Sequence, residues 1–97
     1  MVPGMHHCDG GTGPSEFGQG GVSSTDRDPA TNLAASLEAW VESGRAPNQV
    51  IARQAPAQGA TGGERLRTGL ICAYPQHASL RAGADAANAE GYRCVDP

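Results

Sequence analysis

Large apolar side chains are scarce in this sequence, and their scarcity limits any fold that the chain can form. Leu, Val, Ile and Phe together make 13 of its 97 residues, whereas Gly and Pro together make 21. That content lies well below the roughly 20% that marks a weak hydrophobic core. A formal net charge of −3 is too small to keep a chain unfolded by self-repulsion. The composition therefore favours a piece of a larger protein, whose apolar surfaces meet elements outside this chain.

The charge pattern and the hydropathy pattern exclude several classes of partner. Seven Arg and no Lys stand against ten acidic residues, without a basic run or interleaved aromatic residues that would indicate nucleic-acid binding. No apolar stretch is long enough to span a membrane. No basic segment followed by an apolar one opens the sequence, so no signal peptide is visible. We therefore expect neither a nucleic acid nor a membrane as partner.

The three cysteines suggest one internal disulfide. Cys72 and Cys94 bracket the C-terminal segment with 21 residues between them, a comfortable loop for a disulfide. Cys8 is then left over, because an odd number of cysteines leaves one thiol without a partner in the chain.

One helix is strongly indicated, over about residues 29–43. Asp28 is expected to cap it, Pro29 suits the first helical position, and Gly44 ends it. An apolar stripe recurs at helical spacing and consists of Leu33, Leu37, Trp40 and Val41. The polar face carries Asn32, Ser36 and Glu42.

The remaining segments read as loops and short strands. Two short strands are predicted, at 48–54 and 65–71, with an irregular connection between them. The expected organisation is a glycine-rich loop over 1–27, the helix within 28–44, short strands and loop over 48–71, and a disulfide-closed tail over 72–97.

The stretch "VPGMHHCDGGTGP" holds the residues most able to do chemistry. A histidine on a loop can act as a general base, because histidine titrates near neutral pH. Spacing alone nevertheless favours an ordinary surface loop, since a catalytic triad needs two further partners. A metal site is less favoured still, because four consecutive ligand types cannot readily wrap one tetrahedral ion; these residues are His6, His7, Cys8 and Asp9.

Read together, that stretch, "LEAWVESGRAPNQVIA" and "RLRTGLICAYPQHASLRAGADAANAEGYRCV" resemble the C-terminal part of the tannase and feruloyl esterase family. The shared features are a Pro-Gly-Met-x-His-Cys loop rich in glycine, a Trp-Val-Glu-x-Gly-x-Ala-Pro helix end, a Tyr-Pro-Gln segment after a cysteine, and a closing cysteine. The resemblance extends over residues 1–97 in the order of the family, with variable loops at 15–28 and 54–64.

The resemblance implies an α/β-hydrolase fold with a Ser-Asp-His triad and an inserted lid domain. This chain would be an α/β fragment of it, with one main helix, two short strands and long coil, lacking the central sheet and the lid. His7 becomes the triad histidine, and His6 falls at a position that the family fills variably. Cys8 would bridge a cysteine directly before the nucleophilic serine, Trp40 would pack the helix on the body of the hydrolase, and Met1 would be an internal methionine.

The expected function follows from the same resemblance: a C-terminal segment of a carboxylic ester hydrolase acting on phenolic acid esters of the gallate or hydroxycinnamate type. No serine of this chain stands in a nucleophile context, so we expect the isolated chain to be inactive. No cofactor is expected, and the calcium site of the family's lid would lie outside this chain. The full enzyme is expected to be secreted or periplasmic. The alternative is a small non-enzymatic binding or interaction module, rich in loops and stapled by Cys72–Cys94.

Overall fold

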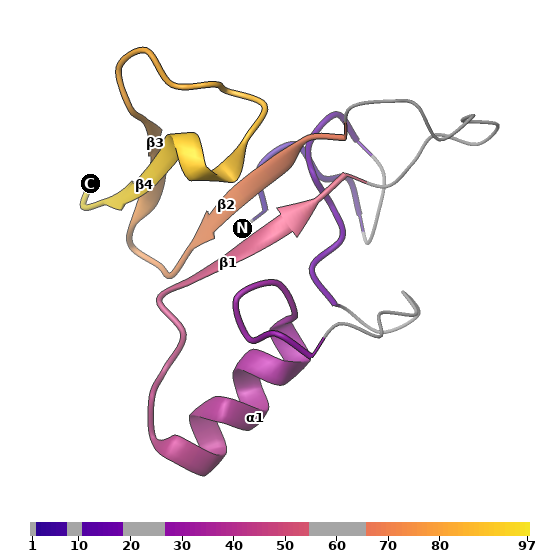
Figure 1. The fold of residues 1–97 in the computed structure, drawn as a ribbon, viewed down its shortest axis with the longest axis vertical. Coiled ribbons are helices and arrows are strands. Elements are labelled where there is room, and N and C mark those ends of the chain that lie inside the picture. Colours follow the sequence, from indigo (N-terminus) through magenta and orange to yellow (C-terminus); the bar gives the residue numbers. More distant parts are fainter. Residues whose placement is uncertain (1, 8–10, 19–26, 55–65) are drawn as a thin grey trace, which may run out of the picture.

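The computed structural model describes residues 2–7, 11–18, 27–54 and 66–97. Within these residues there are one α-helix, two small antiparallel sheets and one 3₁₀ turn (Figure 1). In chain order the elements are α1 (Leu33–Ser43), β1 (Gln49–Arg53), β2 (Thr68–Cys72), β3 (His77–Leu80), η1 (Ala89–Gly91) and β4 (Tyr92–Val95). The architecture agrees with the predicted small α/β fragment in its single main helix and short strands, but the described residues form four strands where two were expected.

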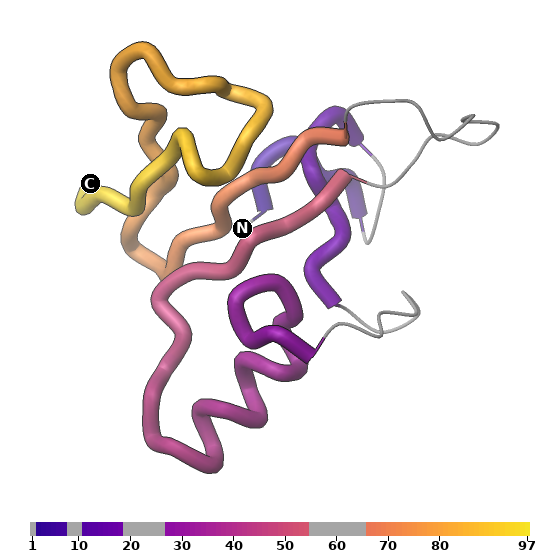
Figure 2. Tube along the Cα trace, in the orientation of Figure 1, coloured from indigo at the N-terminus to yellow at the C-terminus, as the bar shows by residue number. Residues whose placement is uncertain are grey.

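The two sheets are both antiparallel pairs. β1 pairs with β2 so that Val50 faces Ile71, and β3 pairs with β4 so that Ala78 faces Cys94. In Figures 1 and 2 the β1–β2 pair runs through the middle of the molecule, with α1 on one side and the β3–β4 pair on the other. The middle pair therefore connects the helix to the C-terminal segment.

The strands at 48–54 and 65–71 are confirmed as β1 and β2, with shorter bounds. The expectation of only two strands is wrong, because two more strands, β3 and β4, pair within residues 72–97. Each of these two strands has only four residues, too few to show a clear alternation of apolar and polar residues. Their pairing depends on contacts between residues far apart in the sequence, which a local pattern does not reveal.

The predicted start of the helix is also wrong, whereas its end at Gly44 is correct. Asn32, not Asp28, caps α1: its side-chain oxygen accepts from the Ala35 N–H at 3.0 Å. The carbonyl of Ala30 accepts from the Ile51 N–H of β1 at 2.8 Å. That bond occupies an acceptor that a longer helix would need for its own ladder, so residues 29–31 form a turn.

α1 buries two small residues against the rest of this chain, whereas its large apolar residues are exposed. Ala35 and Ser36 are its buried residues, and the Ser36 hydroxyl donates to the Pro29 carbonyl. The apolar stripe has exposed fractions of 44% for Leu33, 56% for Leu37, 47% for Trp40 and 78% for Val41. The residues expected to form the helix's packed face are therefore its exposed face within this chain.

The core is small, as the composition predicts. The buried apolar residues of the described segments are Ala35, Val50, Ala52, Leu70 and Ala89, three of them alanines. Within the described residues no large side chain is fully buried. Among those residues there is also no helix long and apolar enough to cross a membrane. The fold thus owes much of its order to backbone pairing and to the disulfide between β2 and β4.

Candidate functional site

The predicted site lies on a hairpin-like loop near the N-terminus. Met5 and Gly11 form an isolated antiparallel bridge that closes the loop around His6 and His7. Below it, the Gly13 N–H donates to the Gly4 carbonyl at 3.0 Å. Both histidines are exposed, so the closed base of the loop leaves them at the surface of this chain.

The base of the loop is held by close backbone contacts between glycines. A Cβ on Gly11 would lie 2.0 Å from the Gly4 carbonyl oxygen, and a Cβ on Gly13 would lie 2.4 Å from the Pro3 carbonyl oxygen. Gly4 and Gly11 also have φ angles of 76° and 90°, which residues other than glycine rarely adopt. This structural role was not predicted from the sequence, although the Pro-Gly and Gly-Pro pairs around the loop were a signal of tight turns.

The loop is joined to the middle sheet by the residues that follow it. Ser15 and Glu16 donate through their backbone N–H groups to the Arg53 carbonyl at 3.1 and 2.9 Å, and the Arg53 N–H donates back to the Glu16 carbonyl at 2.7 Å. Pro14 packs over Gly69 of β2, where a Cβ would come within 3.1 Å of the proline ring. The histidine loop is therefore fixed to the ends of β1 and β2.

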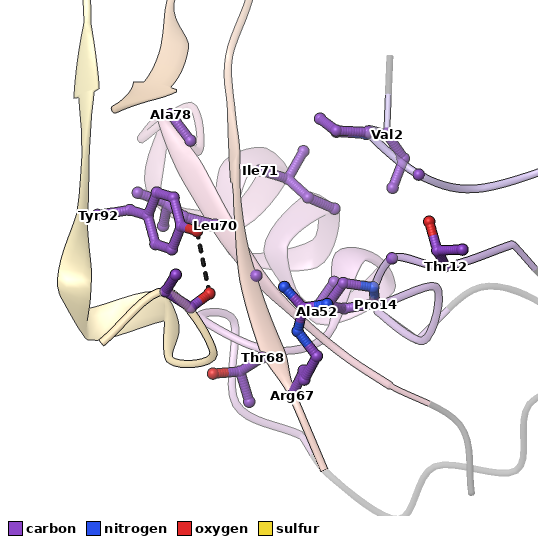
Figure 3. A pocket seen from close by; sticks show the side chains of 15 residues that line it. Val2, Thr12, Pro14, Ala52, Arg67, Thr68, Leu70, Ile71, Ala78 and Tyr92 are labelled. Atoms are coloured by element: carbon purple, nitrogen blue, oxygen red, sulfur yellow. Dashed lines mark hydrogen bonds between the residues drawn. The ribbon is translucent and has the colours of Figure 1, made fainter. Parts of the chain in front are cut away.

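A hollow of about 320 Å³ lies between the base of this loop and the C-terminal segment (Figure 3). Its walls are mainly apolar and come from the N-terminal segment, from β1 and β2, and from β3 and β4; they include Val2, Pro14, Leu70, Ile71 and Ala78. Tyr92 lines it too, and its hydroxyl donates to the Ala86 carbonyl at 3.0 Å. Neither histidine of the loop is among its lining residues.

The predicted disulfide is present. Cys72 at the end of β2 is bonded to Cys94 in β4, with their Cα atoms 5.7 Å apart. The bond joins the middle sheet to the β3–β4 pair, so the sheet to which the histidine loop is attached is also cross-linked to the C-terminal segment. Cys8 lies outside the described residues, and its predicted pairing stays a prediction.

Other candidate groups are engaged in local structure. A carboxylate oxygen of Asp28 accepts from the Ala30 N–H at 2.9 Å, and the Ser43 hydroxyl donates to the Ala39 carbonyl at 2.5 Å. In the part of the chain that the structure describes, no three His, Cys, Asp or Glu side chains are grouped as a metal site would require. The catalytic candidate in these segments is therefore the histidine loop.

Several known proteins are similar to this chain. An esterase of Xanthomonas campestris, itself uncharacterised, is 39% identical over 99% of the chain and 17% of its own length. A feruloyl esterase B of Aspergillus niger is 38% identical over 79% of the chain and 14% of its own length. A mono(2-hydroxyethyl) terephthalate hydrolase of Piscinibacter sakaiensis is 33% identical over 100% of the chain and 13% of its own length. The chain thus spans less than a fifth of each of these relatives.

The fold has similar solved structures as well. The crystal structure of feruloyl esterase B from Aspergillus oryzae superposes with a TM-score of 0.73 at 27% identity, covering 95% of this chain and 17% of that one. The sequence profile of the family described as "Tannase and feruloyl esterase" matches residues 1–95. The resemblance seen in the sequence is thereby confirmed: this chain belongs to the tannase and feruloyl esterase family and corresponds to a short piece of such an esterase.

Proposed function

We propose that this chain supplies the catalytic histidine, His7, of a serine carboxylic ester hydrolase that acts on esters of aromatic acids. The observation that carries the proposal is the His-Cys loop, which is closed at its base and has His7 exposed. The chain that holds this loop belongs to an esterase family. The nucleophilic serine and the acid of the triad would come from the part of the esterase that this chain does not span.

In this proposal His7 moves a proton twice. It first takes the proton of the serine hydroxyl while the serine oxygen bonds to the ester carbonyl carbon. It then gives that proton to the leaving alkoxide as the ester C–O bond breaks, which leaves an acyl-enzyme. In the second half His7 takes a proton from water while the water oxygen bonds to the acyl carbon. It then gives that proton to the serine oxygen as the serine ester bond breaks and the acid is released. An exposed position on a fixed loop suits this role, because the imidazole must reach a group outside this chain.

Cys8 is proposed as a tether for the same loop. A disulfide holds two Cα atoms roughly 4.4–6.8 Å apart, and each catalytic residue would lie about 3.8 Å from its neighbouring cysteine along the chain. A bond from Cys8 to a cysteine directly before the serine would therefore keep the serine and His7 within reach of each other. Together with Cys72–Cys94, it suits an enzyme that matures in an oxidising compartment, outside the cytosol.

The substrate class is supported by the names of the relatives. The feruloyl esterase and the terephthalate hydrolase are both named for esters of aromatic carboxylic acids. We therefore propose an aromatic acyl group as the common element for this chain's enzyme. The rates of hydrolysis of methyl ferulate, methyl gallate and mono(2-hydroxyethyl) terephthalate should be compared to test this.

The experiment uses a chimeric esterase, in which this chain replaces the matched segment of the Xanthomonas campestris relative. His7→Ala should lower turnover by several orders of magnitude, as loss of a triad member does. His6→Ala is the matched control and should cost far less, because that residue has no part in the mechanism. Cys8→Ala should lower activity through lost positioning, and a reducing agent should reproduce its effect. A crippling His6→Ala beside a mild His7→Ala would contradict the assignment.

A further inference from the structure

The base of the histidine loop is more tightly constrained than its exposed position suggests. The Gly4 carbonyl oxygen accepts the Gly13 N–H at 3.0 Å and also lies 2.0 Å from where a Gly11 Cβ would be. Both contacts involve main-chain atoms, which cannot turn aside as the end of a flexible side chain can. Any side chain at position 11 must therefore push apart the two arms of the loop that carries His7.

We propose that Gly11 is a positioning residue for His7, acting with Gly4 and Gly13 as a clasp at the base of the loop. The proposal rests on the catalytic role proposed above for His7. The clasp fixes where the loop leaves the surface and hence the reach and direction of the imidazole. Glycine at position 11 is required because the arms touch there, and not only because φ is positive.

The clasp is attached to a rigid support, and it can therefore determine the position of His7. The arm that contains Gly13 continues through Pro14, which packs on Gly69 of β2, to Glu16, which pairs with Arg53 of β1. The middle sheet is in turn bonded to β4 through Cys72–Cys94. The elements after the histidine loop thus form a platform for it. A displacement at the clasp is therefore expected to move the loop rather than the platform.

The size of the effect follows from the contact. Ordinary van der Waals contact begins at 3.4 Å, so a Cβ placed 2.0 Å from the Gly4 oxygen requires a displacement of about 1.4 Å. A misplacement of about 1 Å in a catalytic group can lower a rate by about 100-fold. In the chimeric esterase, Gly11→Ala should therefore lower kcat by about 10- to 100-fold and leave KM within about twofold, since substrate binding is not changed.

Gly83→Ala is the matched control. Gly83 has a φ of 76°, but a Cβ added there would meet no atom within 4 Å, so the substitution places alanine at a positive φ, as Gly11→Ala does, without the contact. Its kcat should stay within about twofold of the parent. A Gly11→Ala enzyme with unchanged kcat, beside an inactive His7→Ala, would overturn the clasp and leave the proposed function standing. An active His7→Ala would overturn the proposed function and this inference with it.

A second measurement decides the matter if the Gly11→Ala chimera does not fold. Nuclear magnetic resonance of the 97-residue chain should show cross-strand contacts between Met5 and Gly11 in the parent and in Gly83→Ala. In Gly11→Ala those contacts and the protection of the Gly13 N–H should be lost. Their persistence in Gly11→Ala would overturn the inference, because the clasp would then tolerate a side chain.

Discussion

The apolar stripe of α1 should be covered by the rest of the esterase, and Leu37→Ala is the perturbation that tests this. Leu37 is 56% exposed within this chain. Burying a whole leucine side chain contributes about 1.5–3 kcal/mol, so covering its exposed part would add about 0.8–1.7 kcal/mol. Truncating a covered leucine also leaves a cavity, which brings the expected loss of stability in the full domain to about 2 kcal/mol or more.

The same substitution should behave differently in the isolated chain. There Leu37 is already more than half exposed, so less burial is lost than in the full domain, and alanine is the better helix former. The helical circular-dichroism signal should therefore change little. The assay is therefore a pair of measurements: helicity of the isolated chain, and urea unfolding of the chimeric esterase. Trp40 is the only tryptophan of the chain, so in the isolated chain its fluorescence reports directly on solvent access to the stripe.

Glu38→Ala provides the control, because Glu38 is exposed on the same helix and outside the apolar stripe. It should change the stability of the chimera by no more than about 0.5 kcal/mol. Equal effects of Leu37→Ala and Glu38→Ala in the chimera would refute the reasoning. A marked loss of helicity in the isolated chain on Leu37→Ala would also refute it. The stripe would then already be packed within this chain.

Three further predictions concern the disulfide, the helix cap and catalysis. Replacing Cys72 and Cys94 together by serine should cost the chimera about 3 kcal/mol in urea unfolding, from the entropy of a loop with a sequence separation of 22; an unchanged midpoint would contradict this. Asn32→Ala should lower the helicity of the isolated chain, with a cost of about 1 kcal/mol, whereas Asp28→Ala should have the smaller effect; the reverse order would restore Asp28 as the cap. The isolated chain should not hydrolyse methyl ferulate or methyl gallate above the uncatalysed rate, and turnover that survives repeated purification would show that no outside nucleophile is needed.

Local order and composition were enough to predict several features of this chain. Gly44 ends the helix because a left-handed residue is needed after the last turn, and glycine adopts that conformation readily. The Cys72–Cys94 pair followed from loop length, the strands around Val50 and Leu70 from their residue types, and the small core from the few large apolar residues. Four motifs in a fixed order were enough to identify the family.

Other features depend on segments that meet only in the folded chain. The helix begins at Leu33 because the Ala30 carbonyl accepts a hydrogen bond from the Ile51 N–H of β1. The local sequence around the helix start does not reveal this bond, because Ile51 lies about twenty residues further along the chain. Periodicity marks an apolar stripe on a helix but does not say which part of the protein covers it. Within this chain the stripe with Trp40 is exposed.

The base of the histidine loop shows the same division most clearly. The sequence placed His7 in a glycine-rich loop, but it did not say which glycine was needed or for what. Only the folded chain brings Gly11 against the Gly4 carbonyl, because close contact between two backbones is a property of their positions in space. Local order thus identified His7 as the candidate residue, whereas the backbone contact at the base of its loop was revealed only by the folded chain.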